Sequence, residues 1–182
     1  MNTTTKIFML VLILATGLVK VESENQYRQE RLSSPPKVGD IAPEINLLSV
    51  DRTTSYKLSD LRGKIVLLNF WASLAAPCRF ENPNLVKTYK QFKDKQFKNA
   101  KGFTIYSVSL DSDVGNWKAA IEKDGLIWPY HVSDLKAYDS EIVSLYGVRS
   151  IPYNYLIDGD GKILAVNLRG TQLAQTLQKY LQ

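Results

Sequence analysis

Apolar residues recur along the chain at two spacings, which together predict alternating strands and helices. Residues 65–70 form an apolar run broken only by Asn69, which is typical of a strand buried on both faces of a sheet. After it, Leu85, Tyr89 and Phe92 recur at positions i, i+4 and i+7, and this spacing predicts a helix with one apolar face. Further strands are predicted at 45–50, 103–110, 128–132, 153–157 and 163–168, and further helices at 140–146 and 172–181.

The helix predicted between the strands at 103–110 and 128–132 has its own start and stop signals. Asp111 and Asp113 both offer side chains that can cap a helix N-terminus. Trp117 and Ala120 then supply its apolar face, and Gly125 ends it. The order of elements is β-β-α-β-α-β-α-β-β-α. This order predicts an α/β sandwich, in which helices flank a central mixed sheet and an N-terminal hairpin extends the fold.

The first 37 residues differ from the rest of the chain. Residues 7–19 are almost entirely apolar and follow a lysine, but the run is shorter than the ~20 residues of a membrane span. We therefore predict that residues 1–22 are either a cleaved secretory signal peptide or a retained membrane anchor. Residues 23–37 are polar and are predicted to be a tether, and 38–182 the folded domain. Either alternative predicts an exported, periplasmic or extracytoplasmic domain.

Charge and composition exclude several classes of function. The chain has 23 Lys and Arg against 18 Asp and Glu, and a net charge of +5 is too mild to predict nucleic-acid binding. One Cys and one His exclude a disulfide framework and a zinc site built from several such ligands. We expect no metal, no cofactor and no nucleic-acid partner. The lysines between positions 87 and 101 are interpreted as a solvated face, with binding to an anionic surface as the alternative.

Two separated motifs carry the candidate chemistry. The first reads Trp71-Ala72-Ser73-Leu74-Ala75-Ala76-Pro77-Cys78-Arg79, and the second reads Tyr146-Gly147-Val148-Arg149-Ser150-Ile151-Pro152. Both resemble segments of the TlpA/ResA-type thioredoxin-like proteins, within the wider thioredoxin and AhpC/TSA grouping, whose active site reads Trp-Ala-Ser-Trp-Cys-x-Pro-Cys-Arg. The resemblance covers residues 38–182. It implies a thioredoxin-like fold and a thiol–disulfide oxidoreductase that maintains redox balance outside the cytoplasm.

The chain departs from that pattern where the chemistry begins. Ala75 stands at the position of the first Cys, so Ala75-Ala76-Pro77-Cys78 replaces Cys-x-Pro-Cys. In the family, the first Cys attacks as a thiolate at a helix N-terminus, and the second Cys resolves the mixed disulfide. Ala75 has no sulfur, so this two-electron cycle cannot run within the chain. We interpret Cys78 as a small buried hydrophobe, with a single working thiol as the alternative.

The remaining candidate residues follow from the resemblance. It implies that Pro152 is cis and faces the site, and that Glu81 modulates the active-site cysteines. The alternative for Glu81 is an acid in the first helical turn, favoured by the helix dipole. We predict a groove that holds an extended protein or peptide partner by β-addition beside Ile151. The competing hypothesis is a single-cysteine oxidoreductase in which Cys78 reacts and an external thiol resolves it. The predicted groove residues are Trp71, Ala75, Ala76, Pro77, Ile151 and Pro152.

Overall fold

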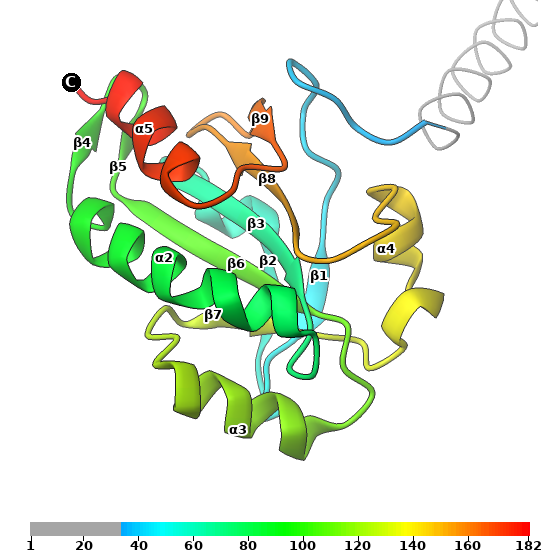
Figure 1. Cartoon of the computed structure of the whole chain (residues 1–182). Coiled ribbons are helices and arrows are strands. Elements are labelled where there is room, and N and C mark those ends of the chain that lie inside the picture. The colour runs from blue at the N-terminus through cyan, green and yellow to red at the C-terminus, as the bar shows by residue number, and fades with distance from the viewer. Residues whose placement is uncertain (1–33) are drawn as a thin grey trace, which may run out of the picture. The chain divides into compact units, whose positions relative to one another are not determined.

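Five strands form the central sheet, in the order β7-β6-β3-β8-β9 (Figure 1). β3 (Ile65–Trp71) lies in the middle, parallel to β6 (Phe103–Ser109) and antiparallel to β8 (Tyr153–Ile157). β7 (Tyr130–Val132) pairs in parallel with β6, and β9 (Ile163–Val166) pairs antiparallel with β8. The sheet is therefore mixed, and the prediction of an α/β fold with a central mixed sheet is confirmed.

Residues 34–182 are the part of the chain that this computed structural model describes. The predicted signal peptide or anchor at 1–22 and most of the predicted tether at 23–37 lie outside them. Contacts group Pro36–Gln182 into one unit. Among the described residues, no helix combines the length and the hydropathy that a membrane crossing requires.

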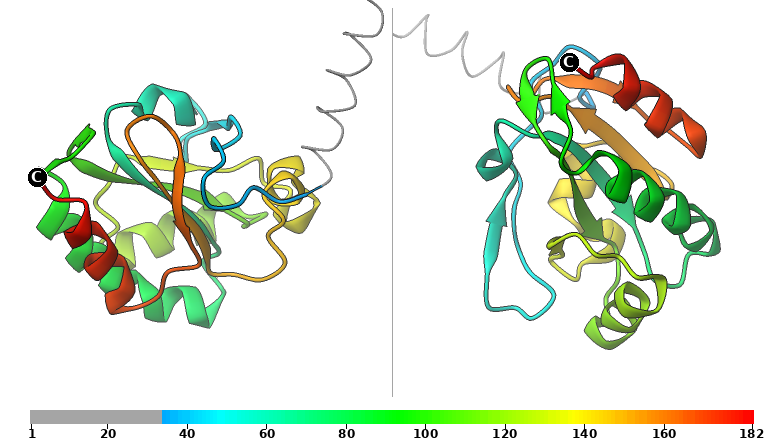
Figure 2. Two further views of the ribbon diagram at one scale, coloured as in Figure 1. Left: turned by 90° about the horizontal axis from the view of Figure 1, so that it is seen from above. Right: turned by 90° about the vertical axis from the view of Figure 1, so that its left-hand side faces the viewer.

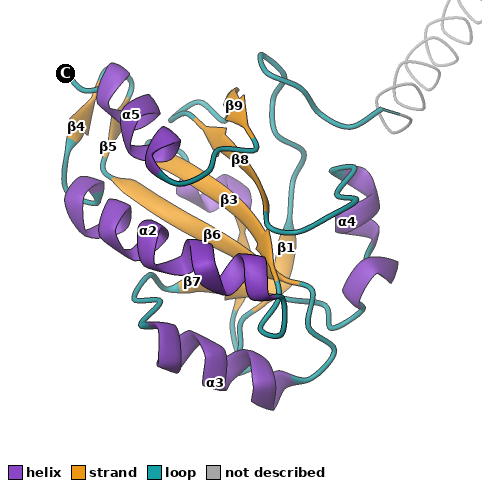
Figure 3. Ribbon diagram, viewed as in Figure 1, coloured by secondary structure: helices purple, strands orange, loops and turns teal. Residues whose placement is uncertain are grey.

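Helices cover both faces of the sheet (Figures 2 and 3). α2 (Ala76–Phe92), α3 (Val114–Asp124) and α5 (Thr171–Lys179) contribute buried side chains to one apolar cluster. The short α4 (Glu141–Leu145) contributes to a second cluster on the other face. Successive residues of β3 alternate between these two clusters, which explains why the strand is apolar along most of its length.

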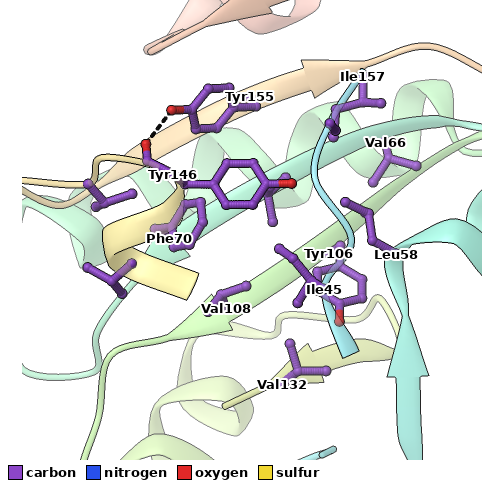
Figure 4. Close-up of a cluster of buried hydrophobic side chains, with 14 of the residues drawn as sticks. Ile45, Leu58, Val66, Phe70, Tyr106, Val108, Val132, Tyr146, Tyr155 and Ile157 are labelled. Carbon is purple, nitrogen blue, oxygen red and sulfur yellow. Dashed lines mark hydrogen bonds between the residues drawn. The ribbon is translucent and has the colours of Figure 1, made fainter. Parts of the chain in front are cut away.

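The second cluster joins the sheet to the N-terminal extension (Figure 4). Three tyrosine hydroxyl groups donate to backbone carbonyls there. The Tyr106 hydroxyl donates to Tyr56 at 2.8 Å, and the Tyr146 hydroxyl to Pro43 at 2.5 Å. The Tyr155 hydroxyl donates to the carbonyl of Tyr146 at 2.5 Å. Two of the three acceptors come from the extension, so it completes the polar pairing of this core.

The extension and several short elements differ in detail from the predicted boundaries. Within it, β1 (Asn46–Leu48) pairs antiparallel with β2 (Ser55–Lys57), which forms the predicted hairpin. The predicted strand 128–132 begins only at Tyr130, because Trp128 turns inward and donates its indole N–H to Ser107. Four elements were not predicted. They are the strands β4 (Gln96–Phe97) and β5 (Ala100–Lys101), which form a hairpin, and the 3-10 helices η1 (Leu58–Leu61) and η2 (Ala137–Asp139).

Candidate functional site

The site begins where β3 delivers the chain to the N-terminus of α2. Ala75 is the N-cap residue and provides no side-chain hydrogen bond to the helix. Pro77 stands in the first turn, where its missing N–H costs no helical hydrogen bond. Ala75 is half-buried, and Ala76 and Pro77 are exposed. The place of the family's attacking thiol therefore holds only the methyl group of Ala75, although the helix N-terminus itself is intact.

Cys78 lies behind this surface, in the core. Only 1% of the residue is exposed, and it packs in the same apolar cluster as Trp71 and Leu85. Burial raises the pKa of the Cys78 thiol, against smaller opposing effects that include the positive charge of Arg169. A thiol with a raised pKa is a poor nucleophile at neutral pH, since the thiolate is the attacking form.

A buried carboxylate fixes the loop between β3 and α2. Both oxygens of Asp111 accept the backbone N–H of Ser73, at 3.0 and 3.1 Å. The hydroxyl groups of Ser73 and Ser109 also donate to Asp111, each at 2.6 Å. Asp111 was predicted as one of two helix caps. Asp113 instead caps α3, accepting the N–H of Asn116 at 2.7 Å, and Asp111 serves the site loop.

A second polar cluster ties α2 to α3. The Arg79 guanidinium donates to both oxygens of Asp124, at 2.5 and 2.6 Å, and to the Ser73 carbonyl at 2.9 Å. Asn82 donates to the same carboxylate at 2.7 Å. Burial by itself would raise the pKa of Asp124, but the hydrogen bonds from Arg79 and Asn82 outweigh it and lower that pKa. The start of α2 is thus fixed from two directions.

The second motif faces this helix start. The Ile151–Pro152 peptide bond is cis, as the resemblance implied. Ile151 is half-buried and packs against both apolar clusters. Within residues 34–182, no hydrogen bond involves the backbone N–H or carbonyl of Ile151, so neither group has a partner in the described fold. The Pro152 carbonyl accepts from the guanidinium of Arg169.

Glu81 does not stand where the dipole argument required it. α2 begins at Ala76, so Glu81 lies beyond the first turn, and the interpretation as a first-turn acid is wrong. Its carboxylate accepts the backbone N–H of Gly170 at 2.8 Å and connects α2 to the loop before α5. Gly170 has a φ of +53°, a conformation that favours glycine.

Not all of the residues predicted to line the groove reach the surface. Trp71 is fully buried and belongs to the core, because β3 points it into the cluster beneath α2, so its assignment to the groove is corrected. Cys78 is likewise hidden from solvent. The residues that do reach the surface include two large apolar side chains, Leu74 at 82% exposed and Phe80 at 81% exposed. Neither was predicted as a site residue, and Leu74 stands where the family pattern has a Trp.

Two polar residues of the site were also missed. Arg169 and Asp111 each lie on a loop that is distant in sequence from the residues they contact, Pro152 and Ser73. The only local signal near Arg169 is the glycine that follows it, which marks a tight turn. Among the described residues, no group of three or more His, Cys, Asp or Glu side chains is arranged to hold a metal ion.

Comparison with known proteins agrees with this arrangement. Residues 38–166 match the AhpC/TSA family. The thiol–disulfide oxidoreductase ResA of Oceanobacillus iheyensis is 31% identical over 178 residues, covering 94% of this chain and 84% of the relative. ResA of Bacillus cereus is 27% identical over 174 residues, covering 94% of this chain and 91% of the relative. These relatives span both motifs of the site.

Solved structures show the same fold. The thioredoxin domain of a thiol–disulfide oxidoreductase from Bacteroides vulgatus has a TM-score of 0.72 and 38% identity, covering 81% of this chain and 99% of that domain. A putative thiol:disulfide interchange protein DsbE from Chlorobium tepidum has a TM-score of 0.65 and 30% identity, covering 80% and 98% of the two chains. The similarity covers about four-fifths of the chain and confirms the predicted thioredoxin-like fold.

Proposed function

The chain belongs to the AhpC/TSA family, and from this premise we propose that it is a ResA/TlpA-like thiol–disulfide oxidoreductase relative that has lost the dithiol reaction and binds a protein partner. Exchange in this class needs a thiolate that attacks a disulfide and a second thiol that resolves the mixed disulfide. One sulfur cannot do both within one chain. The fold and the helix N-terminus are kept, and the attacking atom is absent.

The observation that carries the proposal is the pair formed by Ala75 and Cys78. Ala75 occupies the helix N-cap, where a thiolate would gain from the helix dipole. Cys78 is 1% exposed, and burial raises the pKa of its thiol. The remaining sulfur is therefore both inaccessible and protonated at neutral pH. This burial speaks against the alternative of a single-cysteine oxidoreductase that relies on an external resolving thiol.

What the site retains is a place for an extended chain. The backbone N–H and carbonyl of Ile151 are open beside the start of α2. Main-chain hydrogen bonds from an added strand supply affinity without any thiol, and pockets for alternate side chains supply specificity. Binding at this groove therefore does not require a thiol at position 75.

An extracytoplasmic location forms part of the proposal. The apolar run at 7–19 supports export or anchoring of the chain. The proteins to which the chain is similar include ResA and a putative DsbE. A fusion of residues 1–37 to a reporter that is active only after export tests this point. Activity of the fusion is expected, and a reporter retained in the cytoplasm would contradict it.

The redox part is tested by insulin-disulfide reduction with the full chain. We expect no turnover above background, because no thiol is accessible. The matched control is Ala75→Cys, which returns a thiol to the helix N-cap next to Cys78 and is expected to raise the rate above background. Turnover by the unmodified chain would overturn the proposal.

The rate of thiol alkylation tests whether Cys78 is accessible to a reagent in the native chain. The native chain is expected to react at least ~100-fold more slowly than the unfolded chain, since Cys78 is buried. Rapid alkylation of the native protein at neutral pH, abolished in Cys78→Ser, would favour the single-cysteine enzyme instead.

A further inference from the structure

Arg169 places a positive charge at the groove without an ion-pair partner. The residue is half-buried, on the loop between β9 and α5. Its guanidinium donates to the carbonyls of Leu168, at 2.8 Å, and of Pro152. No carboxylate among residues 34–182 forms an ion pair with it. A guanidinium has five N–H donors, so those that remain can bind an anion in a fixed geometry.

The nearest acid positions this charge but does not pair with it. Glu81 directs its Oε1 atom to the backbone N–H of Gly170, at 2.8 Å, and thereby holds the loop that carries Arg169. Burial lowers the pKa of Arg169, and Glu81 opposes this effect only in part. The cation is thus held in place, partly desolvated and incompletely compensated, a setting in which a charge-assisted hydrogen bond is strong.

Apolar surface is exposed at the start of α2, the helix that Glu81 connects to the loop carrying Arg169. Leu74 and Phe80 flank the first turn of α2 and are 82% and 81% exposed. Most other leucine and phenylalanine side chains of the described domain are buried, so these two are unusual. A ligand that satisfies the whole site therefore needs three features. They are an extended backbone for Ile151, an anionic group for Arg169, and an apolar group for Leu74 and Phe80.

We propose that the partner segment is an extended, acidic peptide in which a side-chain carboxylate pairs with Arg169 and a neighbouring apolar side chain lies against Leu74 and Phe80. The inference rests on the proposed function, because it names the class of partner that the same groove holds. The carboxylate adds recognition that requires no sulfur. It also gives a role to a positive charge beside a site that has no thiolate to stabilise.

The test uses an array of cysteine-free peptides of seven residues, N-acetylated and C-amidated. Each peptide carries one leucine and either glutamate or glutamine at a single varied position. We expect the full chain to prefer glutamate over glutamine about tenfold at the best position, and to lose most of this preference in high salt. Arg169→Met is expected to abolish the preference. Arg169→Lys keeps the charge without the planar fork and is expected to retain only part of it.

The matched control is Arg62→Met, which makes the same change in charge at the other end of β3. Arg62 is exposed and follows η1. The seven residues of β3 separate it from the loop that leads to α2. It is expected to leave the glutamate preference unchanged. Thermal unfolding of each variant shows whether the fold is retained, and Arg169→Lys keeps the test decisive if Arg169→Met unfolds.

Each outcome separates this inference from the proposed function. Peptides that bind equally well with glutamate and glutamine would overturn the acidic partner and leave partner binding intact. Binding only by peptides with a free C-terminal carboxylate, in a parallel array without C-amidation, would overturn the assignment to a side chain. An equal loss of preference in Arg62→Met would show a general charge effect and also overturn it. Binding of no peptide at all would overturn the proposed function itself.

Discussion

Neighbouring positions at the start of α2 differ sharply in burial. Cys78 stands in the first turn of α2 and faces the core, whereas Phe80, two residues on, faces solvent. A helix turns by about 100° per residue, so two positions separate opposite sides of it. The resolving position of this family is therefore a buried one by geometry. Ala75, the other position of the pair, is half-buried and carries no sulfur.

His131 is a second buried titratable group, and its surroundings favour the neutral ring. The ring stacks on Trp128 with centroids 5.5 Å apart, and its Nε2 atom donates to the Leu126 carbonyl at 3.1 Å. Within the described residues, Nδ1 has no hydrogen-bond partner. Burial lowers the pKa of His131 from 6.5 to about 4. The unfolded chain thus binds this proton more readily than the folded chain does.

The pH dependence of stability follows from that difference. A group with a lowered folded pKa contributes stability that is present above pH 6.5 and is lost as the pH falls toward 4. We expect the wild-type free energy of unfolding to fall more steeply over this range than that of His131→Gln, by up to about 1.4 kcal/mol per pH unit. Urea unfolding of both proteins at several pH values measures the two slopes.

The comparison contains its own control. Carboxylates that titrate in the same range are shared by the two proteins, so their effects cancel in the difference. At pH 7.5 the remaining gap reports only the lost packing on Trp128 and the lost hydrogen bond. Parallel slopes for the two proteins between pH 6.5 and 4 would contradict the assignment of a neutral, buried His131.

At the scale of elements, the loop between β3 and α2 is held by a carboxylate, Asp111, that follows the neighbouring strand β6. β3 and β6 are parallel, so their C-terminal ends meet at one edge of the sheet, with Trp71 opposite Ser109 in the register. Ser73 and Asp111 follow these two ends directly. Asp111 can therefore accept from Ser73, and these hydrogen bonds fix the loop without any contribution from a thiol.

Replacing this carboxylate should loosen the loop. Asp111→Asn leaves one acceptor oxygen where two now accept from Ser73 and Ser109, and directs an NH₂ group at a donor. We expect the free energy of unfolding to fall by about 2 kcal/mol, since a buried polar group is left poorly paired. The matched control is Asp113→Asn, because Asn caps a helix about as well as Asp. A loss of equal size in both variants would contradict the role assigned to Asp111.

The same scale shows which parts of the fold were predictable. The buried strand and α2 follow from local periodicity, and the cis proline was implied by the resemblance of the second motif to the family. All three are present in the structure. Arg169 and Asp111 could not be assigned to the site, since their partners come from distant loops and only the assembled sheet brings them together. The hairpin of β4 and β5 is too short and too lysine-rich to produce a strand pattern.

At the scale of the whole molecule, two apolar clusters on opposite faces of the sheet carry the stability. Cys78 belongs to one of them and is only one of many buried members. The cysteine is free, so the described fold contains no disulfide that the loss of a thiol could remove. The described fold therefore does not depend on a disulfide at the start of α2.

The last prediction concerns the N-terminal extension, which covers the face opposite α2. Ile45 is fully buried there, and backbone carbonyls of Pro43 and Tyr56 accept the hydroxyl groups of Tyr146 and Tyr106. A chain of residues 38–182 keeps all of these contacts and is expected to melt at the same temperature as the full chain. A chain of residues 58–182 loses them.

The shorter chain should be markedly less stable. Losing the burial of Ile45 lowers the free energy of unfolding by about 2 kcal/mol, and losing the two hydrogen bonds lowers it by about 1 kcal/mol each. Exposure of the tyrosine rings to water adds to this loss. A loss of about 5 kcal/mol approaches the whole stability of many domains and lowers the melting temperature by roughly 15 °C. Thermal unfolding followed by circular dichroism measures both chains. Equal melting temperatures would mean that the extension only lies on a domain that is already complete, whereas an early, broad transition in the shorter chain alone makes the extension part of the core that supports the groove.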